Sequence, residues 1–223
     1  MIPLRDSVPS STTPVVTYAI VAINVLIFIQ QLALSPEELH HFFAHYGVVP
    51  ARLQLTDLFT SMFLHGGFMH LIGNMWFLWI YGDNVEDVLG RAKYLGFYLT
   101  CGIAGSLVQI AADPGTSIPN IGASGAIAGV MGAYLLKFPH ARVLTLIPLF
   151  VVFFTRELPA YIILIYWFIL QFFSGVGTLA ESSTGATGGI AFFAHVGGFL
   201  MGMLLIKVLP SREAYWRRPE LHW

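Results

Sequence analysis

Long apolar runs, separated by short polar segments, dominate this chain. A bilayer core needs about 20 apolar residues per helix, and closely packed helices can use fewer. The runs therefore predict six membrane-spanning helices: Val15–Leu34, Met62–Tyr81, Tyr94–Ala111, Ile121–Lys137, Leu158–Gly175 and Gly188–Leu209. Val143–Phe154 is also apolar, but it is short and contains Pro148. We expect it to be an interfacial or re-entrant piece, or a part of the fifth span.

Composition supports a polytopic membrane protein with an all-α fold. Of the 223 residues, 56% are hydrophobic and 10% are charged, whereas a soluble domain carries about 25% charged residues. A net charge of -1 gives no reason to expect nucleic acid as a partner. Residues 14–210 are predicted to form one bundle in the lipid bilayer, flanked by cytoplasmic segments at 1–13 and 211–223, the second of them basic and aromatic.

The distribution of cations predicts the orientation of the bundle. With the N-terminus inside, ten of the 11 Lys and Arg residues fall in cytoplasmic segments, and the outer loops hold only Arg52. Such a bias is the positive-inside signal of multi-pass proteins. We therefore expect six spans with both ends in the cytoplasm, and an inner (plasma) membrane location.

This topology places four polar residues at one depth. The second, fourth and sixth spans then run from outside to inside, and each carries polar residues near its start: His70 and Asn74, Ser124, and His195. At 1.5 Å per residue, these residues lie roughly 5 to 12 Å below the starts of their helices. Because polar groups inside a membrane are costly, they are candidates for function.

Ser124 and His195 are both followed by small residues at helical spacing. Gly125, Gly129 and Gly132 follow the serine, and Gly198 and Gly202 follow the histidine. If these two faces meet, the hydroxyl and the imidazole come within hydrogen-bond reach, and a histidine is the usual group that activates a serine. Small faces also serve simple helix packing in membranes. Packing does not require an imidazole, however, so an intramembrane serine hydrolase is the favoured hypothesis.

His70 and Asn74 are four residues apart and therefore share one face of a helix. Donors of this kind stabilise the oxyanion of a tetrahedral intermediate, and the backbone N–H of Ser124, near a helix start, would be a further donor. The alternative interpretation is a pair of interhelical hydrogen bonds that hold the bundle together.

No Asp or Glu is predicted at the depth of this site. The working hypothesis is therefore a Ser–His dyad whose histidine is held by packing rather than by a carboxylate, unlike the soluble triad. Metal binding is the other reading of the histidines, which pair at His41 and His45 and at His65 and His70. A zinc site needs three protein ligands and an open position, and it would leave Ser124 in its glycine setting unexplained. We predict no metal and no cofactor.

The motifs together resemble those of the rhomboid intramembrane serine proteases over nearly the full length of the chain. The matching pieces are Phe59-Thr60-Ser61-Met62-Phe63-Leu64-His65-Gly66, the HxxxN arrangement of His70 and Asn74, Gly122-Ala123-Ser124-Gly125, and Ala194-His195-Val196-Gly197-Gly198. Gly-x-Ser-Gly alone is weak. The four pieces in this order on the second, fourth and sixth spans are highly specific.

The resemblance implies that Ser124 is the nucleophile and His195 the general base and acid, with His70 and Asn74 in the oxyanion hole. It implies substrates that are single-span membrane proteins, cut near the outer surface where a helix is easily unwound. We also expect Gly122, Ala123 and Gly125 to contact substrate. Glu86, which matches an acidic position at the cytoplasmic end of the second span, is expected to be structural, as are Gly198 and Gly202.

The chain departs from the family pattern at two places. Many members carry Trp-Arg in the first outer loop, where Thr56-Asp57 stand here, and some place a tyrosine four residues after the serine, where Ala128 stands. His195 is then oriented by other neighbours. No seventh span or large soluble extension is predicted, which favours the compact prokaryotic form.

Two other functions compete with an active protease. The first is a catalytically inactive rhomboid-like protein that binds membrane clients, which the presence of all four site residues disfavours. The second is a transporter or channel, which would need polar groups that continue to the cytoplasmic face. Ala126-Ile127-Ala128-Gly129-Val130-Met131, which follow the site, offer none.

Overall fold

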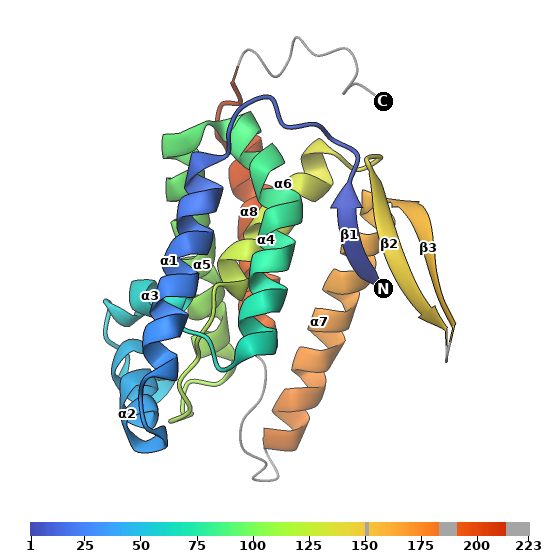
Figure 1. The fold of residues 1–223 in the computed structure, drawn as a ribbon. Coiled ribbons are helices and arrows are strands. Elements are labelled where there is room, and N and C mark those ends of the chain that lie inside the picture. The colour runs from blue at the N-terminus through green and yellow to red at the C-terminus, as the bar shows by residue number, and fades with distance from the viewer. Residues whose placement is uncertain (150–151, 183–190, 213–223) are drawn as a thin grey trace.

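The computed structural model describes residues 1–149, 152–182 and 191–212; for residues 179–182 it describes the backbone only. It is mostly helical (Figure 1), and it adds one small sheet that the apolar pattern did not predict. Six longer helices form the bundle: α1 (Val15–Leu32), α4 (Phe68–Leu89), α5 (Arg91–Ala112), α6 (Ser124–Lys137), α7 (Ala160–Ser182) and α8 (Phe192–Val208).

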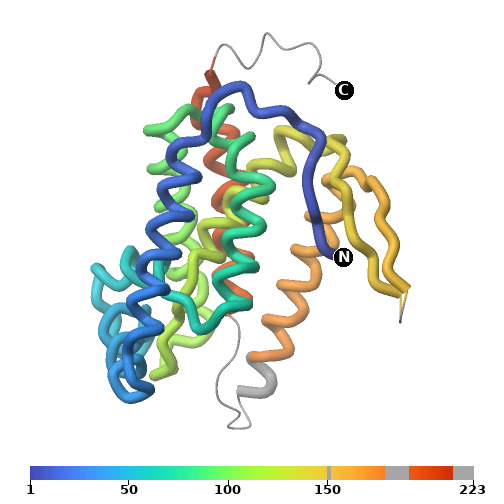
Figure 2. The backbone as a smooth tube through the Cα atoms, viewed as in Figure 1, coloured from blue at the N-terminus to red at the C-terminus, as the bar shows by residue number. Residues whose placement is uncertain are grey.

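Successive helices of the bundle run in opposite directions, so that α4, α6 and α8 share one direction (Figures 1 and 2). We call the end that carries residues 6–14, Gly90 and 209–212 the terminal end, and the end that carries residues 33–67 and 113–123 the loop end. Helix α6 is the central element, because every residue from Gly125 to Tyr134 is buried.

Three helices are long and apolar enough to cross a membrane on length and composition alone, at Val15–Leu32, Arg91–Ala112 and Ala160–Thr178. The apolar helix Phe192–Val208 is shorter. Helix α6 has 14 residues, and α4 contains Asp83, Glu86 and Asp87. The length and composition of these helices support a membrane protein and account for three of the six predicted spans.

The second apolar run forms a helix with different bounds from those predicted. Met62–Tyr81 was expected to be helical, but residues 61–63 form the 3₁₀ helix η2 (Ser61–Phe63) and α4 begins at Phe68, after Gly66-Gly67. The helix then continues eight residues beyond Tyr81. Its acidic residues find partners in the N-terminal segment, and the helix can therefore extend through a polar stretch.

The loop end contains a compact set of short elements. Helix α2 (Pro36–Tyr46) begins with a capping box, in which Ser35 and Glu38 bond to each other's backbone N–H groups. It is followed by η1 (Pro50–Arg52) and α3 (Asp57–Thr60). The backbone of Val48 pairs with that of Asn120, which ties these elements to the segment that leads into α6.

The described residues of Val143–Phe154, 143–149 and 152–154, are strands and do not belong to the fifth helix. They belong to β2 (Arg142–Leu149) and to β3 (Val152–Pro159), which pair antiparallel. A third strand, β1 (Ile2–Asp6), pairs with β2, so that the sheet order is β1-β2-β3. The β-branched and aromatic residues of this run favour strands, and the N-terminal segment supplies a strand that the local sequence could not reveal.

Candidate active site

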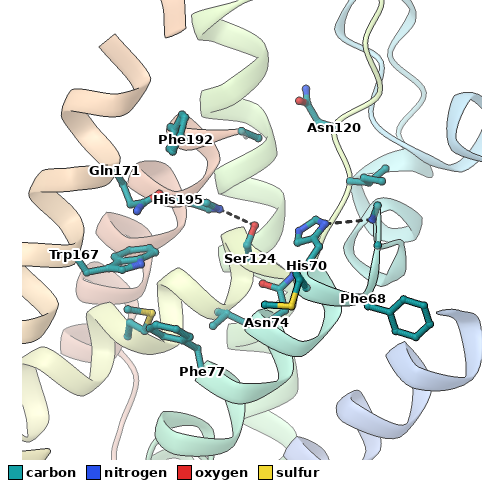
Figure 3. A pocket seen from close by; sticks show the side chains of 18 of the residues that line it. Phe68, His70, Asn74, Phe77, Asn120, Ser124, Trp167, Gln171, Phe192 and His195 are labelled. Atoms are coloured by element: carbon teal, nitrogen blue, oxygen red, sulfur yellow. Dashed lines mark hydrogen bonds between the residues drawn. The ribbon is translucent and has the colours of Figure 1, made fainter. Parts of the chain in front are cut away.

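Ser124 and His195 come together in the interior of the bundle. Ser124 is the first residue of α6, and His195 lies in the first turn of α8 with 7% of its surface exposed. The distance between Ser124 Oγ and His195 Nε2 is 2.7 Å, which is a hydrogen bond (Figure 3). The two residues are 71 positions apart in the chain, and the packing of α6 against α8 brings them together.

Glycines make that packing possible. A Cβ atom added to Gly198 would lie 1.9 Å from the carbonyl oxygen of Gly125, and one added to Gly202 would lie 2.0 Å from that of Gly129. No side chain fits at such distances. The two backbones are thus in direct contact along the faces that the sequence predicted, and this contact fixes the separation of the serine and the histidine.

The imidazole of His195 has a second hydrogen-bond partner. Its Nδ1 atom lies 2.7 Å from Oε1 of Gln171 on α7. Trp167, one turn earlier on α7, places its ring centroid 5.6 Å from that of the imidazole. No described carboxylate bonds to this histidine, and an amide that the sequence did not indicate holds it in addition to packing.

Gln171 was not among the predicted site residues. A carboxylate is the usual group that fixes a catalytic histidine, and none was predicted at the depth of the site. The available signal was the rule that polar side chains inside a membrane are functional candidates, because Gln171 is an amide within the predicted fifth span, Leu158–Gly175.

His70 and Asn74 face the same site from α4. The backbone N–H of Gly66 donates to Nδ1 of His70 at 3.3 Å, so the imidazole proton is on Nε2. That Nε2 atom faces Gly122, since a Cβ atom there would lie 2.7 Å from it and 3.7 Å from Nδ2 of Asn74. Two side-chain N–H donors therefore lie beside the backbone next to Ser124.

Gly122 is required at its position for two reasons. Its φ of +127° is in the region that favours glycine, and a side chain would collide with His70. Asn74 Nδ2 is buried and has no hydrogen-bond partner in the described part of the chain. The Ser124 N–H lies in the first turn of α6, where helical donors have no acceptor within the helix. All three donors are thus free to bind a ligand oxygen.

A cavity of about 1020 Å³ opens in front of these groups (Figure 3). Its walls are mostly apolar and come from α4, α6, α7 and α8 together with residues 119–121. Among the residues that line it are Phe68, Met69, Phe77, Ile127, Met131 and Trp167. An apolar cavity with a few convergent polar groups is the usual form of a ligand site.

A second, small cavity of about 20 Å³ touches Ser124 from behind. Polar side chains surround it, namely Ser61, Ser106, Gln109 and Asn120. Its volume suits about one water molecule, and polar lining is what a buried water needs. Gln109 also accepts hydrogen bonds from the backbone N–H groups of Phe193 and Ala194, at 3.1 and 3.3 Å, and so caps the start of α8.

Of the other residues predicted for the site or for structure, two lie next to Ser124 and one lies near the opposite end of α4. Ala123 and Gly125 flank Ser124 and are buried. Glu86 lies far from the site near the end of α4, where its carboxylate accepts hydrogen bonds from the backbone N–H groups of Val16 and Thr17 and from the Thr17 hydroxyl. Over the described ranges, no three His, Cys, Asp or Glu side chains come together as a metal site would need.

Comparison with known proteins places the chain in a family. The model of the rhomboid domain matches residues 52–212. The chain belongs to the rhomboid family. All four site residues lie within the matched region, so the family resemblance and the geometry described above concern the same part of the protein.

Curated rhomboid relatives include both a protease and mitochondrial proteins. The chain is 32% identical over 211 residues to rhomboid protease GluP of Bacillus subtilis, and the aligned region covers 92% of this chain and 37% of that protein. It is 31% identical over 193 residues to rhomboid protein 1, mitochondrial, of Saccharomyces cerevisiae (84% and 51%). It is 27% identical over 208 residues to the human presenilin-associated rhomboid-like protein, mitochondrial (90% and 49%). The chain thus spans about half the length, or less, of these relatives.

Proposed function

We propose that this rhomboid-family chain is an intramembrane serine endopeptidase that cleaves single-span membrane proteins through an acyl-enzyme. The observation that carries the proposal is the 2.7 Å hydrogen bond between Ser124 Oγ and His195 Nε2, at the wall of a cavity that can admit a peptide. A nucleophile within hydrogen-bond reach of its base is the signature of covalent catalysis.

The first half-reaction is the attack of the serine. His195 Nε2 takes the proton from Ser124 Oγ as the oxygen attacks the scissile carbonyl carbon. Negative charge then develops on the carbonyl oxygen. The N–H groups of His70 Nε2, Asn74 Nδ2 and the Ser124 backbone converge beside Gly122 and are the donors for that charge. His195 returns the proton to the leaving amine, which leaves an ester on Ser124.

The second half-reaction is hydrolysis of that ester. His195 takes a proton from a water molecule, whose oxygen attacks the ester carbonyl, and the same donors stabilise the second oxyanion. The proton then passes to Ser124 Oγ, which leaves. The polar cavity behind Ser124, lined by Ser61, Ser106 and Gln109, is large enough to supply a water next to the nucleophile.

The substrate class follows from the walls of the cavity and the setting of the site. Apolar side chains line most of it, and the polar groups of His70, Asn74, Ser124 and His195 are among the rest of the lining. This combination suits an unwound stretch of a transmembrane segment, because its side chains are apolar and its peptide groups become available only once the helix opens. Cleavage at small residues near the outer surface fits this requirement.

Topology and location complete the proposal. With six spans and both ends in the cytoplasm, ten of the 11 cations lie inside, and the loop end, with Ser124 near it, faces outward. We place the enzyme in the inner (plasma) membrane as a multi-pass protein. Cysteine labelling from each side of the membrane, on a Cys101→Ala background, tests this: introduced cysteines in residues 113–118 should react from outside and those at 139–141 from inside.

The chemical test is labelling of the purified protein by a fluorophosphonate probe, which reacts with activated serines. We compare the wild type with Ser124→Ala and His195→Ala and measure folding of each by thermal denaturation. Labelling that needs both residues supports the dyad. A folded wild-type protein that neither reacts nor cleaves a single-span substrate contradicts the proposal and favours a client-binding protein instead.

A further inference from the structure

We infer that Gln171 is a positioning residue for His195, so that the site works as a hydrogen-bonded Ser124–His195–Gln171 triad rather than as a dyad. This inference rests on the proposed protease function. Two hydrogen bonds, each of 2.7 Å, join Oγ of the serine to Nε2 of the imidazole and Nδ1 of the imidazole to Oε1 of the glutamine. The three side chains come from α6, α8 and α7 in turn.

The amide oxygen determines where the imidazole proton lies. A neutral imidazole has one N–H and one bare nitrogen. Because Oε1 of Gln171 only accepts, Nδ1 of His195 must carry the proton, and Nε2 is left with the lone pair that accepts the Ser124 hydroxyl proton. The opposite tautomer would present an N–H to the serine and could not act as a base. Gln171 therefore selects the reactive tautomer.

An amide suits this position better than a carboxylate does. In soluble triads an aspartate performs the same task, but a carboxylate in an apolar, membrane-embedded site carries a large desolvation cost. The described surroundings of His195 hold no charge that would offset it: α6 contributes Ser124, α7 contributes Gln171 and Trp167, and His70 on α4 is the titratable side chain that acts on it electrostatically.

Trp167 and Gln171 act on the imidazole from one face of α7. They are one turn apart and so point in the same direction. The indole ring lies over the imidazole with an interplanar angle of 36°, while the amide bonds to its edge. Both side chains also line the large cavity, opposite His70 and Asn74. The base is thus held by a helix that forms a wall of the cavity.

The experiment measures the rate of fluorophosphonate labelling of Ser124 against pH in three variants. Gln171→Leu removes the acceptor, and Gln171→Glu keeps an acceptor and adds a charge. Asn24→Leu is the matched control, because Asn24 is a fully buried amide on α1 that bonds to the backbone of its own helix and does not line the cavity. Each rate is expressed per folded molecule.

We expect Gln171→Leu to label about 10- to 100-fold more slowly, because a buried N–H loses its acceptor and the reactive tautomer is no longer selected. Gln171→Glu should recover most of the rate at high pH. Its acid limb should move to higher pH, since a carboxylate stabilises the protonated imidazole. Asn24→Leu should change thermal stability only.

Two results would overturn the inference. One is a Gln171→Leu variant that labels at the wild-type rate per folded molecule. The other, which decides the matter if Gln171→Leu does not fold, is a Gln171→Glu variant whose acid limb coincides with that of the wild type. Both leave the dyad in place. A wild-type protein that does not label at all contradicts the protease proposal itself.

Discussion

The two halves of α4 both carry polar side chains into the bundle, but they treat them in opposite ways. Near the terminal end, the Glu86 carboxylate accepts three hydrogen bonds at 2.8 to 3.0 Å from the first residues of α1. Near the loop end, the Asn74 side-chain nitrogen is buried and has no partner in the described part of the chain. In one half the carboxylates of Glu86 and Asp87 are bonded to the start of the chain, and we call it the saturated half for these two groups. Tyr81 Oη and Asn84 Oδ1 in the same half have no partner in the described part of the chain. The other half is held open toward a cavity.

The saturated half joins distant parts of the chain. Glu86 supplies the acceptors that the start of α1 lacks, because Pro14 offers no side-chain cap, and a carboxylate there is favoured by the helix dipole. Asp87 accepts in the same way from the backbone N–H groups and hydroxyls of Ser11 and Thr12. These bonds stabilise the fold and leave little capacity for a ligand.

The open half shows what a binding function requires. A buried donor without a partner costs about 1–3 kcal/mol, and it is tolerated where a ligand can take the bond. Comparison of the two halves therefore separates polar residues by role: substitutions in the saturated half should change stability, and substitutions around the cavity should change rate.

The largest effect is expected at the nucleophile. Ser124→Ala should lower kcat for a single-span substrate by at least about 10⁴-fold, because no other described hydroxyl lies within hydrogen-bond reach of His195 Nε2. The thermal midpoint should stay close to that of the wild type. A protein that is stable and still cleaves at the wild-type rate would show that the serine is not the nucleophile.

Asn74→Ala should give the next largest loss. Removal of one oxyanion donor costs about 10²- to 10³-fold in kcat, and since Asn74 Nδ2 makes no bond within the described protein, stability should change little. The measurement is kcat and the thermal midpoint on the same preparation. If Asn74→Ala kept full activity but clearly lost stability, Asn74 would have a structural role and would not be an oxyanion donor.

Glu86→Ala should do the opposite. The N–H groups of Val16 and Thr17 lose their acceptor at a buried site, so we expect a loss of about 1–3 kcal/mol in the free energy of unfolding. The kcat per folded molecule should stay within a few-fold of the wild type. Glu86→Gln retains one carbonyl oxygen and should lie between the two proteins. Equal stability of all three would refute the capping role.

The smallest effect concerns pH at the terminal end. Burial raises the pKa of Asp6, in β1, to about 6, even though the Tyr134 hydroxyl donates to it at 2.5 Å. The folded protein then keeps a proton that the unfolded chain has released, so this contribution to stability is present below about pH 4 and is lost by about pH 6. Asp6→Asn should flatten the fall of the thermal midpoint over that range. An unchanged slope would contradict the shift.

Much of this arrangement could be predicted from the sequence, because it depends on local patterns. Apolar runs located the six longer helices to within a few residues at most ends, and the glycines after Ser124 and His195 indicated which faces meet. Residues near one another in the chain share a helix face, so His70 and Asn74 could be paired without a structure.

What could not be predicted depends on partners far away in the chain. Asp83, Glu86 and Asp87 mark the end of an apolar run, but the helix continues through them because residues 10–17 supply hydrogen-bond donors to all three carboxylates. In the same way, the pairing of Val143–Leu146 with β1, about 140 positions earlier, could not be inferred from the local sequence, although the hairpin partner β3 follows directly. Gln171 meets His195 across 24 positions, and nothing in its immediate neighbours indicates this.

The contact between Gly125 and Gly198 determines how precisely the distance between Ser124 and His195 is fixed. Where two helices meet through side chains, a neighbouring rotamer can change and absorb a small shift. Here carbonyl oxygens lie where a Cβ atom would be, and nothing at this interface can repack. The distance between the nucleophile and the base is therefore fixed by two helix backbones in direct contact. Whenever α6 and α8 pack against each other, Ser124 and His195 lie at the reactive distance. Even a single methyl group added at Gly198 would push the two helices apart.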